Sequence, residues 1–427
     1  MFVGSLFLYS VFALVAGFAK TPIGLDVLCG VLGIFSASAV PPAVGILGVA
    51  YGKPSRRKNA AFACFSAGNP LGYVFGTIFG GLAANIFNWR ASFWLIAIIF
   101  LAFTTIGFFT IPKDWTDKEP MNWTAVKRFD LLGTAMTIGG IGMFSAALSL
   151  GATAKQGWST SYVIALLVIG IALLVGFVFW ENFYKFPLVP MGIWKDRNFS
   201  LNLAILMLGF MAFTPGSFFI ALYFQDVWNM SALQVAVHLL PMAISGLLVN
   251  VIAALILHRV SNKLLMYIGT AAYTVAFLLL TFNRVDSSYW AFCFSSFCIM
   301  VIGADLEFNV ANMYVMSSMP AHQQSVAGGI FQTVAKLCMT LGFGIATAIF
   351  NSVQADLNAM ATTGFWDRET RPYAATFWFS TACSVFAICL VPFLTIGTQG
   401  GKEKRQNSTP SAELDSAIGN DDEKPDR

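Results

Sequence analysis

Charged residues are scarce in this 427-residue chain. They make up 11% of it, whereas hydrophobic residues make up 57%. An average soluble domain carries about 25% charged residues. So few charges cannot cover a water-soluble particle, and composition therefore excludes an ordinary soluble domain. The 41 Phe and 11 Trp strengthen this conclusion, because aromatic side chains suit lipid contact and the membrane interface. The net charge of +4 gives no reason to expect a nucleic-acid partner.

Patterns that would indicate an enzyme or an ATP-driven pump are also missing. Gly52-Lys53 is followed by Pro54 and lacks the spacing of a nucleotide-binding loop. We find no metal-ligand cluster and no nucleophile–base pair, so we expect neither catalysis nor a cofactor. The cysteines all fall in apolar runs without metal-ligand spacing, which implies no disulfide framework. They are Cys29, Cys64, Cys293, Cys298, Cys338, Cys383 and Cys389.

What the chain has in quantity is apolar stretches, most of them near the ~20 residues that cross a bilayer as a helix. The first six lie near 2–19, 23–51, 60–84, 91–112, 131–152 and 160–180. The second six lie near 199–224, 232–257, 264–282, 288–317, 325–350 and 374–397. No basic segment precedes the first stretch and many others follow it, so we interpret it as a span rather than a signal peptide. The sequence predicts an all-α polytopic membrane protein of about 12 spans.

The distribution of basic residues predicts the orientation of these spans, because Lys and Arg favour cytoplasmic loops. With the N-terminus inside, 18 of the 25 Lys and Arg residues lie in cytoplasmic segments and six lie outside. The remaining one, Lys336, falls within a span. We therefore expect both termini in the cytoplasm.

Polar connectors divide the chain into candidate domains. The longest before the C-terminal tail, 113–130, carries charges of both signs and separates the first four spans from the rest. The tail lacks apolar periodicity, so we expect it to be disordered. The predicted parts are a helical bundle at 1–112, a cytoplasmic linker at 113–130, two central helices at 131–181, a six-helix bundle at 182–397 and a cytoplasmic tail at 398–427.

Five glycines form the most informative pattern. Gly68, Gly72, Gly76 and Gly80 recur every four residues on one helix face, and Gly81 widens the strip. In lipid, such glycines let helix backbones approach closely. Ordinary tight packing is one interpretation. The other is a smooth strip along which two helices slide or rock during a functional cycle.

The segment GYVFGTIFGG at 72–81 resembles the antiporter motif GxxxGPxxGG on the fifth helix of major facilitator superfamily transporters. Its glycines match, while Thr77 stands where proline is usual. The preceding segment, LDVLCGVLGIFSAS, resembles the fourth-helix motif through Gly33. Cys29 stands at the place of that motif's arginine, which is associated with proton coupling in the family, and Leu32 at the place of its glutamine.

Three later segments resemble the fungal fourteen-helix drug:proton antiporter branch, including exporters of the aminotriazole and boron resistance type. They are FDLLG at 129–133, PLVPMGIWKDRNFS at 187–200 and the stretch 303–333. This resemblance implies the major facilitator fold with two central helices. In its register the chain begins at the third helix, so we expect a first bundle that lacks two helices.

Three ionisable residues fall inside predicted spans, where charge is expensive and indicates function. Asp305 and Glu307 lie near the middle of 288–317, and Lys336 lies near the middle of 325–350. Residues two apart on a helix point in roughly opposite directions, so we pair Lys336 with Asp305 and direct Glu307 toward the central cavity. A buried salt bridge that fixes helix register and a charge that binds substrate or a proton are both open interpretations.

Two further residues are candidates for the transport pathway. His238 lies near the outer end of its span, where it either belongs to the proton pathway, as a histidine side chain can, or simply packs at the interface. Pro215 lies in the middle of 199–224, where the missing backbone donor predicts a kinked or unwound helix.

Together these features predict a secondary transporter that exports a small organic molecule or inorganic acid by alternating access, with proton exchange. We expect a monomer in the plasma membrane or, alternatively, the vacuolar membrane. The alternatives are a uniporter or importer, favoured by Cys29 at the arginine position, and a truncated membrane protein without transport activity.

Overall fold

The computed structural model describes residues 1–50, 56–111, 130–151, 154, 157–184, 191–256, 260–318, 324–357 and 368–396. Within these ranges the ordered elements are helices, and none of the described residues forms a β-strand. The predicted linker, apart from Asp130, and the predicted tail lie outside the described residues. The all-α polytopic fold predicted from composition is confirmed.

Each of the twelve predicted apolar stretches coincides with a long helix. The first six helices are α1 (Phe2–Ala16), α2 (Pro22–Ala50), α3 (Arg56–Ile86), α4 (Trp89–Thr110), α6 (Leu131–Gly151) and α7 (Ser161–Phe183). The second six are α8 (Arg197–Asp226), α9 (Ala232–Ile256), α10 (Asn262–Thr281), α11 (Ser295–Ser317), α12 (Gln324–Leu357) and α13 (Arg371–Leu390). Short helical turns extend or connect these helices: η1 (Gly157–Ser159), η2 (Met191–Lys195), η3 (Trp290–Phe294) and η5 (Val391–Phe393).

Among the described helices, ten are long and apolar enough to cross a membrane. Of the other two, α1 has only 15 residues, and α3 has 31 but opens with Arg56, Arg57 and Lys58. This length and apolar character identify an integral multi-pass membrane protein.

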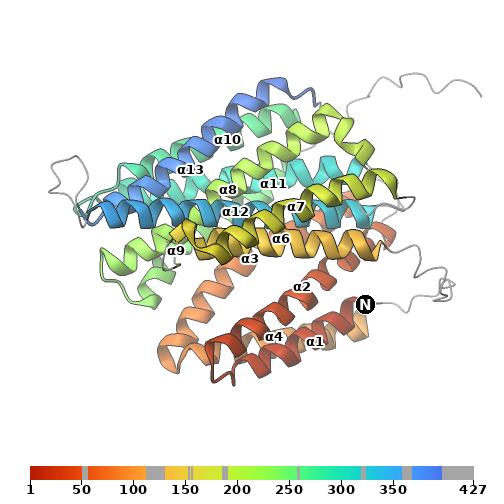
Figure 1. The fold of residues 1–427 in the computed structure, drawn as a ribbon, viewed down its shortest axis with the longest axis horizontal. Helices are drawn as coiled ribbons and strands as arrows, with labels where there is room; N and C mark the ends of the chain where they lie inside the picture. The colour runs from red at the N-terminus through yellow and green to blue at the C-terminus, as the bar shows by residue number, and fades with distance from the viewer. Residues whose placement is uncertain are drawn as a thin grey trace, which may run out of the picture.

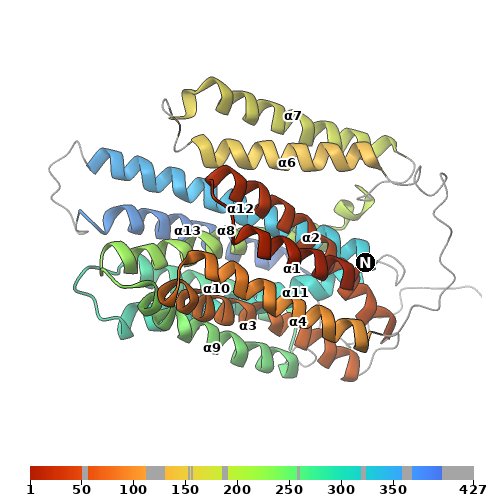
Figure 2. The same cartoon turned by 90° about the horizontal axis from the view of Figure 1, so that it is seen from below.

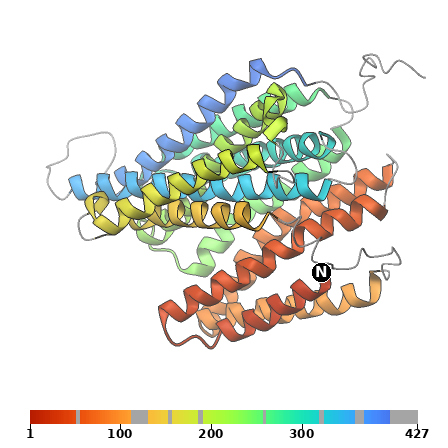
Figure 3. The same cartoon turned by 45° about the vertical axis from the view of Figure 1, so that its right-hand side comes forward.

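The helices gather in three groups. Figures 1 and 3 show α1, α2 and α4 on one side of the molecule and α8–α13 on the other, with α3 reaching across to pack against α9. Helices α6 and α7 form a hairpin that leans on α12, as Figure 2 shows most clearly. Helix α12 also contacts α2, so it touches all three groups.

Most of the well-buried apolar side chains belong to α8–α13. One cluster joins Phe219, Tyr223, Tyr273, Phe277 and other residues between α8, α10 and α11. The N-terminal helices contribute only a small cluster, made of Ala13, Ala16, Leu32 and Ala97. Helices α8–α13 are therefore more densely packed than the N-terminal helices. A polar side chain buried among them is shielded from water.

Close backbone approach holds the α6–α7 hairpin together. A Cβ on Gly170 would lie 2.8 Å from the Phe144 backbone nitrogen and 3.2 Å from the Gly140 oxygen. Asp130 caps the start of α6, because its Oδ1 accepts from the Gly133 N–H at 2.8 Å and from Trp180 Nε1 of α7 at 2.8 Å. Asp130 thus ties the first turn of α6 to the far end of α7.

The glycine strip on α3 makes fewer close contacts with other described helices than its pattern predicts. No described residue outside α3 comes within 4 Å of a Cβ built on Gly68, Gly72, Gly76 or Gly80. Gly81 faces α9, where Ala236 Cβ and the Ala232 oxygen lie 3.5 and 3.6 Å from its built Cβ. Among the described contacts, the helix-packing role is therefore limited to the Gly81 end.

Pro215 does not unwind α8, which runs unbroken from Arg197 to Asp226. Proline supplies no N–H to the Met211 carbonyl one turn earlier. Gly342 of α12 packs against that position: a Cβ there would lie 2.5 Å from the Met211 oxygen and 2.6 Å from its Cα. The predicted unwinding does not occur, because packing against α12 keeps the helix continuous at the site of the missing hydrogen bond. The alternative, a kink at Pro215, stays a prediction.

We expect Gly170→Ala to lower the free energy of unfolding by about 1–3 kcal/mol, because the new methyl group would overlap the α6 backbone, which cannot give way. Gly142→Ala is the matched control on the same hairpin, because no described atom lies within 4 Å of its built Cβ. It should be neutral or stabilising by up to about 1 kcal/mol. Thermal unfolding of both variants in detergent measures the difference, and equal midpoints would contradict the close α6–α7 contact.

Candidate functional site

The two acids of α11 lie on different faces of the helix, as their spacing predicts. Helix α11 packs against α8, α9 and α10, so its middle is enclosed by neighbours. Glu307 is 1% exposed, while Asp305 is half-buried. The two carboxyl groups therefore have separate environments.

Glu307 occupies a narrow slot between α8 and α10. A Cβ on Gly269 of α10 would lie 3.2 Å from Glu307 Cγ, and a Cβ on Gly209 of α8 would overlap the carboxyl oxygen Oε2. Glycine at both positions thus leaves the space that the carboxyl fills. Neither carboxyl oxygen has a hydrogen-bond partner among the described residues. The Glu307 side chain therefore lies between helices rather than facing an open central cavity.

An aromatic ring closes the slot. Tyr273 of α10 is 1% exposed and packs on Gly303 of α11, where a Cβ would lie 2.7 Å from Tyr273 Cγ. The Tyr273 ring stacks on Phe277 with centroids 5.8 Å apart and an angle of 15°. Glycine at 303 lets the ring approach the α11 backbone. This packing keeps water away from Glu307 in the described conformation.

The chemical consequence is a restriction on charge. An ionised carboxylate without water, a cation or hydrogen-bond donors carries a desolvation penalty of at least several kcal/mol. A protonated carboxyl is neutral and loses far less on burial. Glu307 therefore fits its slot in the protonated form, and it can ionise only after the helices around it move apart.

Asp305 belongs to a polar group that joins α11 to α9. Its carboxylate lies beside the Asn250 side chain, whose Nδ2 donates to the Gly246 backbone oxygen at 3.0 Å. Asn309 Nδ2 donates to Asn250 Oδ1 at 3.2 Å and to the Asp305 backbone oxygen at 2.8 Å. Asp305 Oδ2 is buried and has no partner among the described residues. The group thus presents carboxylate and amide oxygens at one place inside the bundle.

The predicted ion pair between Lys336 and Asp305 does not form among the described contacts. Lys336 is exposed on α12, whereas Ala327, Phe331 and Ala335 of the same helix are buried in a cluster with α8 and α11. The sequence pattern predicted that Asp305 and Lys336 lie at similar depths in the membrane. Packing of the alanines and the phenylalanine instead turns Lys336 away from α11.

His238 is held by backbone and aromatic contacts. Its Nδ1 lies 2.8 Å from the Gln234 oxygen, and its ring centroid lies 4.8 Å from that of Tyr289 in an edge-on arrangement. Tyr289 Oη donates to the His238 backbone oxygen at 2.7 Å. These contacts fit a packing role at the helix end.

Sequence reasoning missed the residues that shape the acid sites. Asn250 and Asn309 lie within apolar stretches, and that unusual placement is a signal that could have identified them. Gly209, Gly269 and Tyr273 carry no comparable signal. Their role arises only because α8, α10 and α11 meet at the depth of Glu307.

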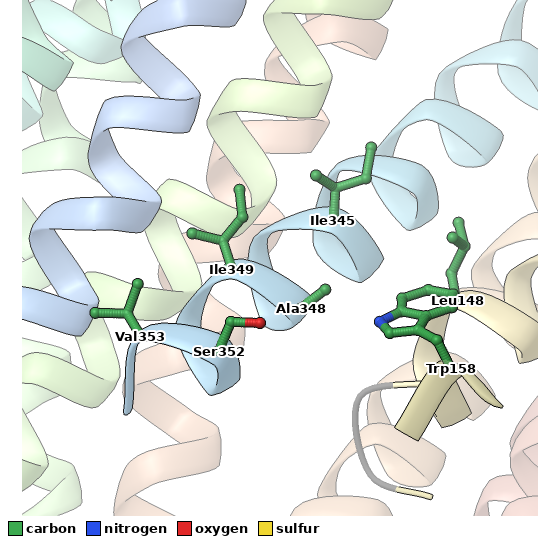
Figure 4. A pocket seen from close by; sticks show the side chains of 7 residues that line it. All are labelled: Leu148, Trp158, Ile345, Ala348, Ile349, Ser352 and Val353. Atoms are coloured by element: carbon green, nitrogen blue, oxygen red, sulfur yellow. The ribbon is translucent and has the colours of Figure 1, made fainter. Parts of the chain in front are cut away.

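An apolar pocket of about 420 Å³ lies apart from the acids, between α12 and the junction of α6 with η1. In Figure 4, Leu148 and Trp158 face a row of α12 side chains across it. Ser352 is the one lining residue with a polar side chain besides the Trp158 indole. The lining residues are Leu148, Trp158, Ile345, Ala348, Ile349, Ser352 and Val353.

Comparison with known proteins gives consistent matches. Residues 1–181 match the sequence model of the Major Facilitator Superfamily. The low affinity ammonium transporter of Saccharomyces cerevisiae is 30% identical over 356 residues, which cover 82% of this chain and 68% of that protein. Efflux pump terJ of Aspergillus terreus is 28% identical over 417 residues, covering 97% and 78%. The aminotriazole resistance protein of S. cerevisiae is 23% identical over 327 residues, covering 76% and 59%.

A solved structure shares the fold. The crystal structure of a POT family transporter in complex with a thioalcohol-conjugated peptide superposes with a TM-score of 0.61 at 16% identity. The match covers 92% of this chain and 82% of that one. At this identity the likeness concerns the arrangement of the helices alone.

The slot geometry predicts coupling between Gly209 and Glu307. Gly209→Ala should lower the free energy of unfolding by about 1–3 kcal/mol, because the methyl group competes with the carboxyl for the same space. In a Glu307→Ala background the carboxyl is gone and only the Tyr273 ring, with Cε2 3.1 Å from the built Cβ, still crowds the methyl group, so the same substitution should cost less. Thermal unfolding of the four proteins in detergent gives the coupling energy, which should exceed about 0.5 kcal/mol. Additive effects would contradict the contact.

Proposed function

This chain belongs to the Major Facilitator Superfamily, and we propose that it is a secondary transporter that exports a small molecule by alternating access in exchange for protons. The observation that carries the proposal is the Glu307 carboxyl, which is 1% exposed and has no described partner for either oxygen. A group in this position is neutral while enclosed and can ionise when hydrated, which is what a proton carrier requires.

The slot links protonation to conformation. Glu307 is enclosed because α8 and α10 approach it through Gly209 and Gly269. Separation of these helices admits water, and the carboxyl then releases its proton to the side that is open. Return to the packed state requires a proton again, because the unpaired carboxylate is excluded from the slot. A cycle in which uptake and release face opposite sides moves protons across the membrane.

The N-terminal half supports placing this step in the C-terminal bundle. The fourth-helix motif that the chain resembles has arginine where this sequence has Cys29. Cys29 is exposed and carries no positive charge. With that arginine absent, the buried acids of α11 are the described groups best suited to couple protons.

The names of relatives guide the choice of substrate. The matches include an efflux pump and an aminotriazole resistance protein. We therefore propose a small organic cargo. We also propose a four-helix N-terminal bundle, two central helices and a six-helix C-terminal bundle as the working parts, in a monomer that resides in the plasma membrane with both termini in the cytoplasm.

A second candidate is the passage of a small cation without obligatory proton exchange. Its support is the match with the low affinity ammonium transporter, together with the oxygens of Asp305, Asn250 and Asn309. Ammonium donates four hydrogen bonds, and carboxylate and amide oxygens accept them. In this alternative Asp305, rather than Glu307, is the essential acid.

Transport by cells that lack their major exporters distinguishes the two candidates. We expect the wild-type chain to drive efflux of labelled aminotriazole that depends on an inward proton gradient. Glu307→Gln should reduce this efflux at least about tenfold, the equivalent of 1.4 kcal/mol. Exchange of labelled for unlabelled aminotriazole should persist, because glutamine keeps the shape and neutrality of the protonated carboxyl.

Asp305→Asn is the matched control on the same helix, and methylammonium uptake is the second assay. Gradient-driven efflux should survive Asp305→Asn better than Glu307→Gln. Wild-type efflux kinetics in Glu307→Gln would refute the proposed role of the slot. Methylammonium uptake that is lost only in Asp305→Asn, without any proton-dependent efflux in the wild type, would establish the second candidate instead.

A further inference from the structure

Lys336 is exposed well inside a membrane span. It lies nine residues into the span Ala327–Ala355, and no described residue forms an ion pair with it. An ammonium group that faced lipid at this depth would be strongly disfavoured, and intramembrane charges almost always face the protein interior or a water-filled cavity. The exposed face of α12 around Lys336 is therefore a surface in contact with water.

The packing of α12 indicates where this face points. Ala327, Phe331 and Ala335 face the cluster with α8 and α11, while Gly344 packs against Leu148 of α6. Lys336 belongs to neither contact. Figures 1 and 2 show α12 running between its own bundle and the α6–α7 hairpin, and α12 also contacts α2 of the N-terminal group. Lys336 thus lies on the helix where the parts of the molecule meet.

Two threonines share the face of Lys336, because positions three and four residues apart are neighbours on a helix. Thr333 Oγ1 donates to the Gly329 oxygen at 2.8 Å, and Thr340 Oγ1 donates to the Lys336 oxygen at 3.0 Å. Each hydroxyl has therefore used its only proton and offers a lone pair outward. The face combines one positively charged donor with an acceptor on the turn before it and on the turn after it.

This pattern specifies a class of ligand. The ammonium group matches a carboxylate or another anionic group, and the two threonine oxygens match donors on the same ligand. A plain carboxylate would leave the acceptors unmatched, and a neutral hydroxy compound would leave the charge unmatched. We infer that Lys336, Thr333 and Thr340 form a substrate subsite for small organic anions that also carry hydroxyl or amino groups. The inference rests on the proposed transport function and adds organic anions to the cargo that the transporter would accept beside neutral aminotriazole.

Binding to the purified full-length chain in detergent tests this subsite without a proton gradient. Lactate is the probe, propionate is the same anion without the hydroxyl group, and lactamide has the hydroxyl group without the charge. Titration followed by tryptophan fluorescence should give saturable lactate binding, weaker propionate binding and lactamide binding at least about tenfold weaker. Wild-type protein that shows no saturable lactate binding overturns the inference.

Substitutions assign the binding to the proposed residues. Lys336→Met should weaken lactate binding about tenfold or more, while Lys336→Arg should retain it, because arginine preserves the charge. Lys20→Met is the matched control, since Lys20 is an exposed lysine between α1 and α2. Thr333→Val with Thr340→Val should bring lactate affinity down to that of propionate. Unchanged lactate binding in Lys336→Met overturns the inference.

The outcome is separable from that of the proposed function. Lys336-dependent lactate binding by a chain that moves no protons in cells supports the subsite and refutes proton exchange. Proton-dependent aminotriazole efflux that survives Lys336→Met, together with lactate binding unchanged in the same variant, refutes the subsite and leaves proton exchange standing.

Discussion

The enclosure of the Glu307 carboxyl by Gly209 and Gly269 is the contact on which the proposed coupling of protonation to helix movement depends. A carboxyl group can enter a tightly packed helix bundle without a cation only if it is neutral. The two glycines provide its space, and Tyr273, packed on Gly303, closes it. Any movement that separates α8 from α10 changes the charge that this position tolerates. Helix packing and protonation are therefore two descriptions of one equilibrium.

Helix α8 connects this slot to the rest of the molecule. Gly209 faces Glu307, and two residues further along α8 the Met211 backbone meets Gly342 of α12. Helix α12 carries Lys336 and packs against both α6 and α2. A shift of α8 that opens the slot must therefore disturb the α8–α12 contact. Through the contact between Met211 and Gly342, protonation of Glu307 can therefore change how α12 packs against α6 and α2.

The positions of the helices along the chain could be predicted well from the sequence, but the rotation of each helix about its own axis could not. Apolar length alone located the twelve helices, and the two-residue spacing of Asp305 and Glu307 placed them on different faces of α11. Lys336 was assigned the wrong partner, because the rotation of α12 about its axis is set by Ala327, Phe331 and Ala335 packing against other helices. Pro215 was predicted to kink or unwind α8, and contact with α12 keeps the helix continuous. The type of a side chain can be read from the sequence. The direction in which it faces depends on packing against residues that are distant in the chain.

The central claim is that Glu307 holds a proton in the packed conformation. Infrared difference spectroscopy of the purified protein at neutral pH tests it directly, because a protonated carboxyl has a carbonyl stretch that a carboxylate lacks. We expect such a band in the wild type, its persistence in Asp305→Asn and its loss in Glu307→Gln. A wild-type spectrum at neutral pH with no protonated-carboxyl band that depends on Glu307 would show that this carboxyl is ionised in the packed conformation and refute its role as a proton carrier.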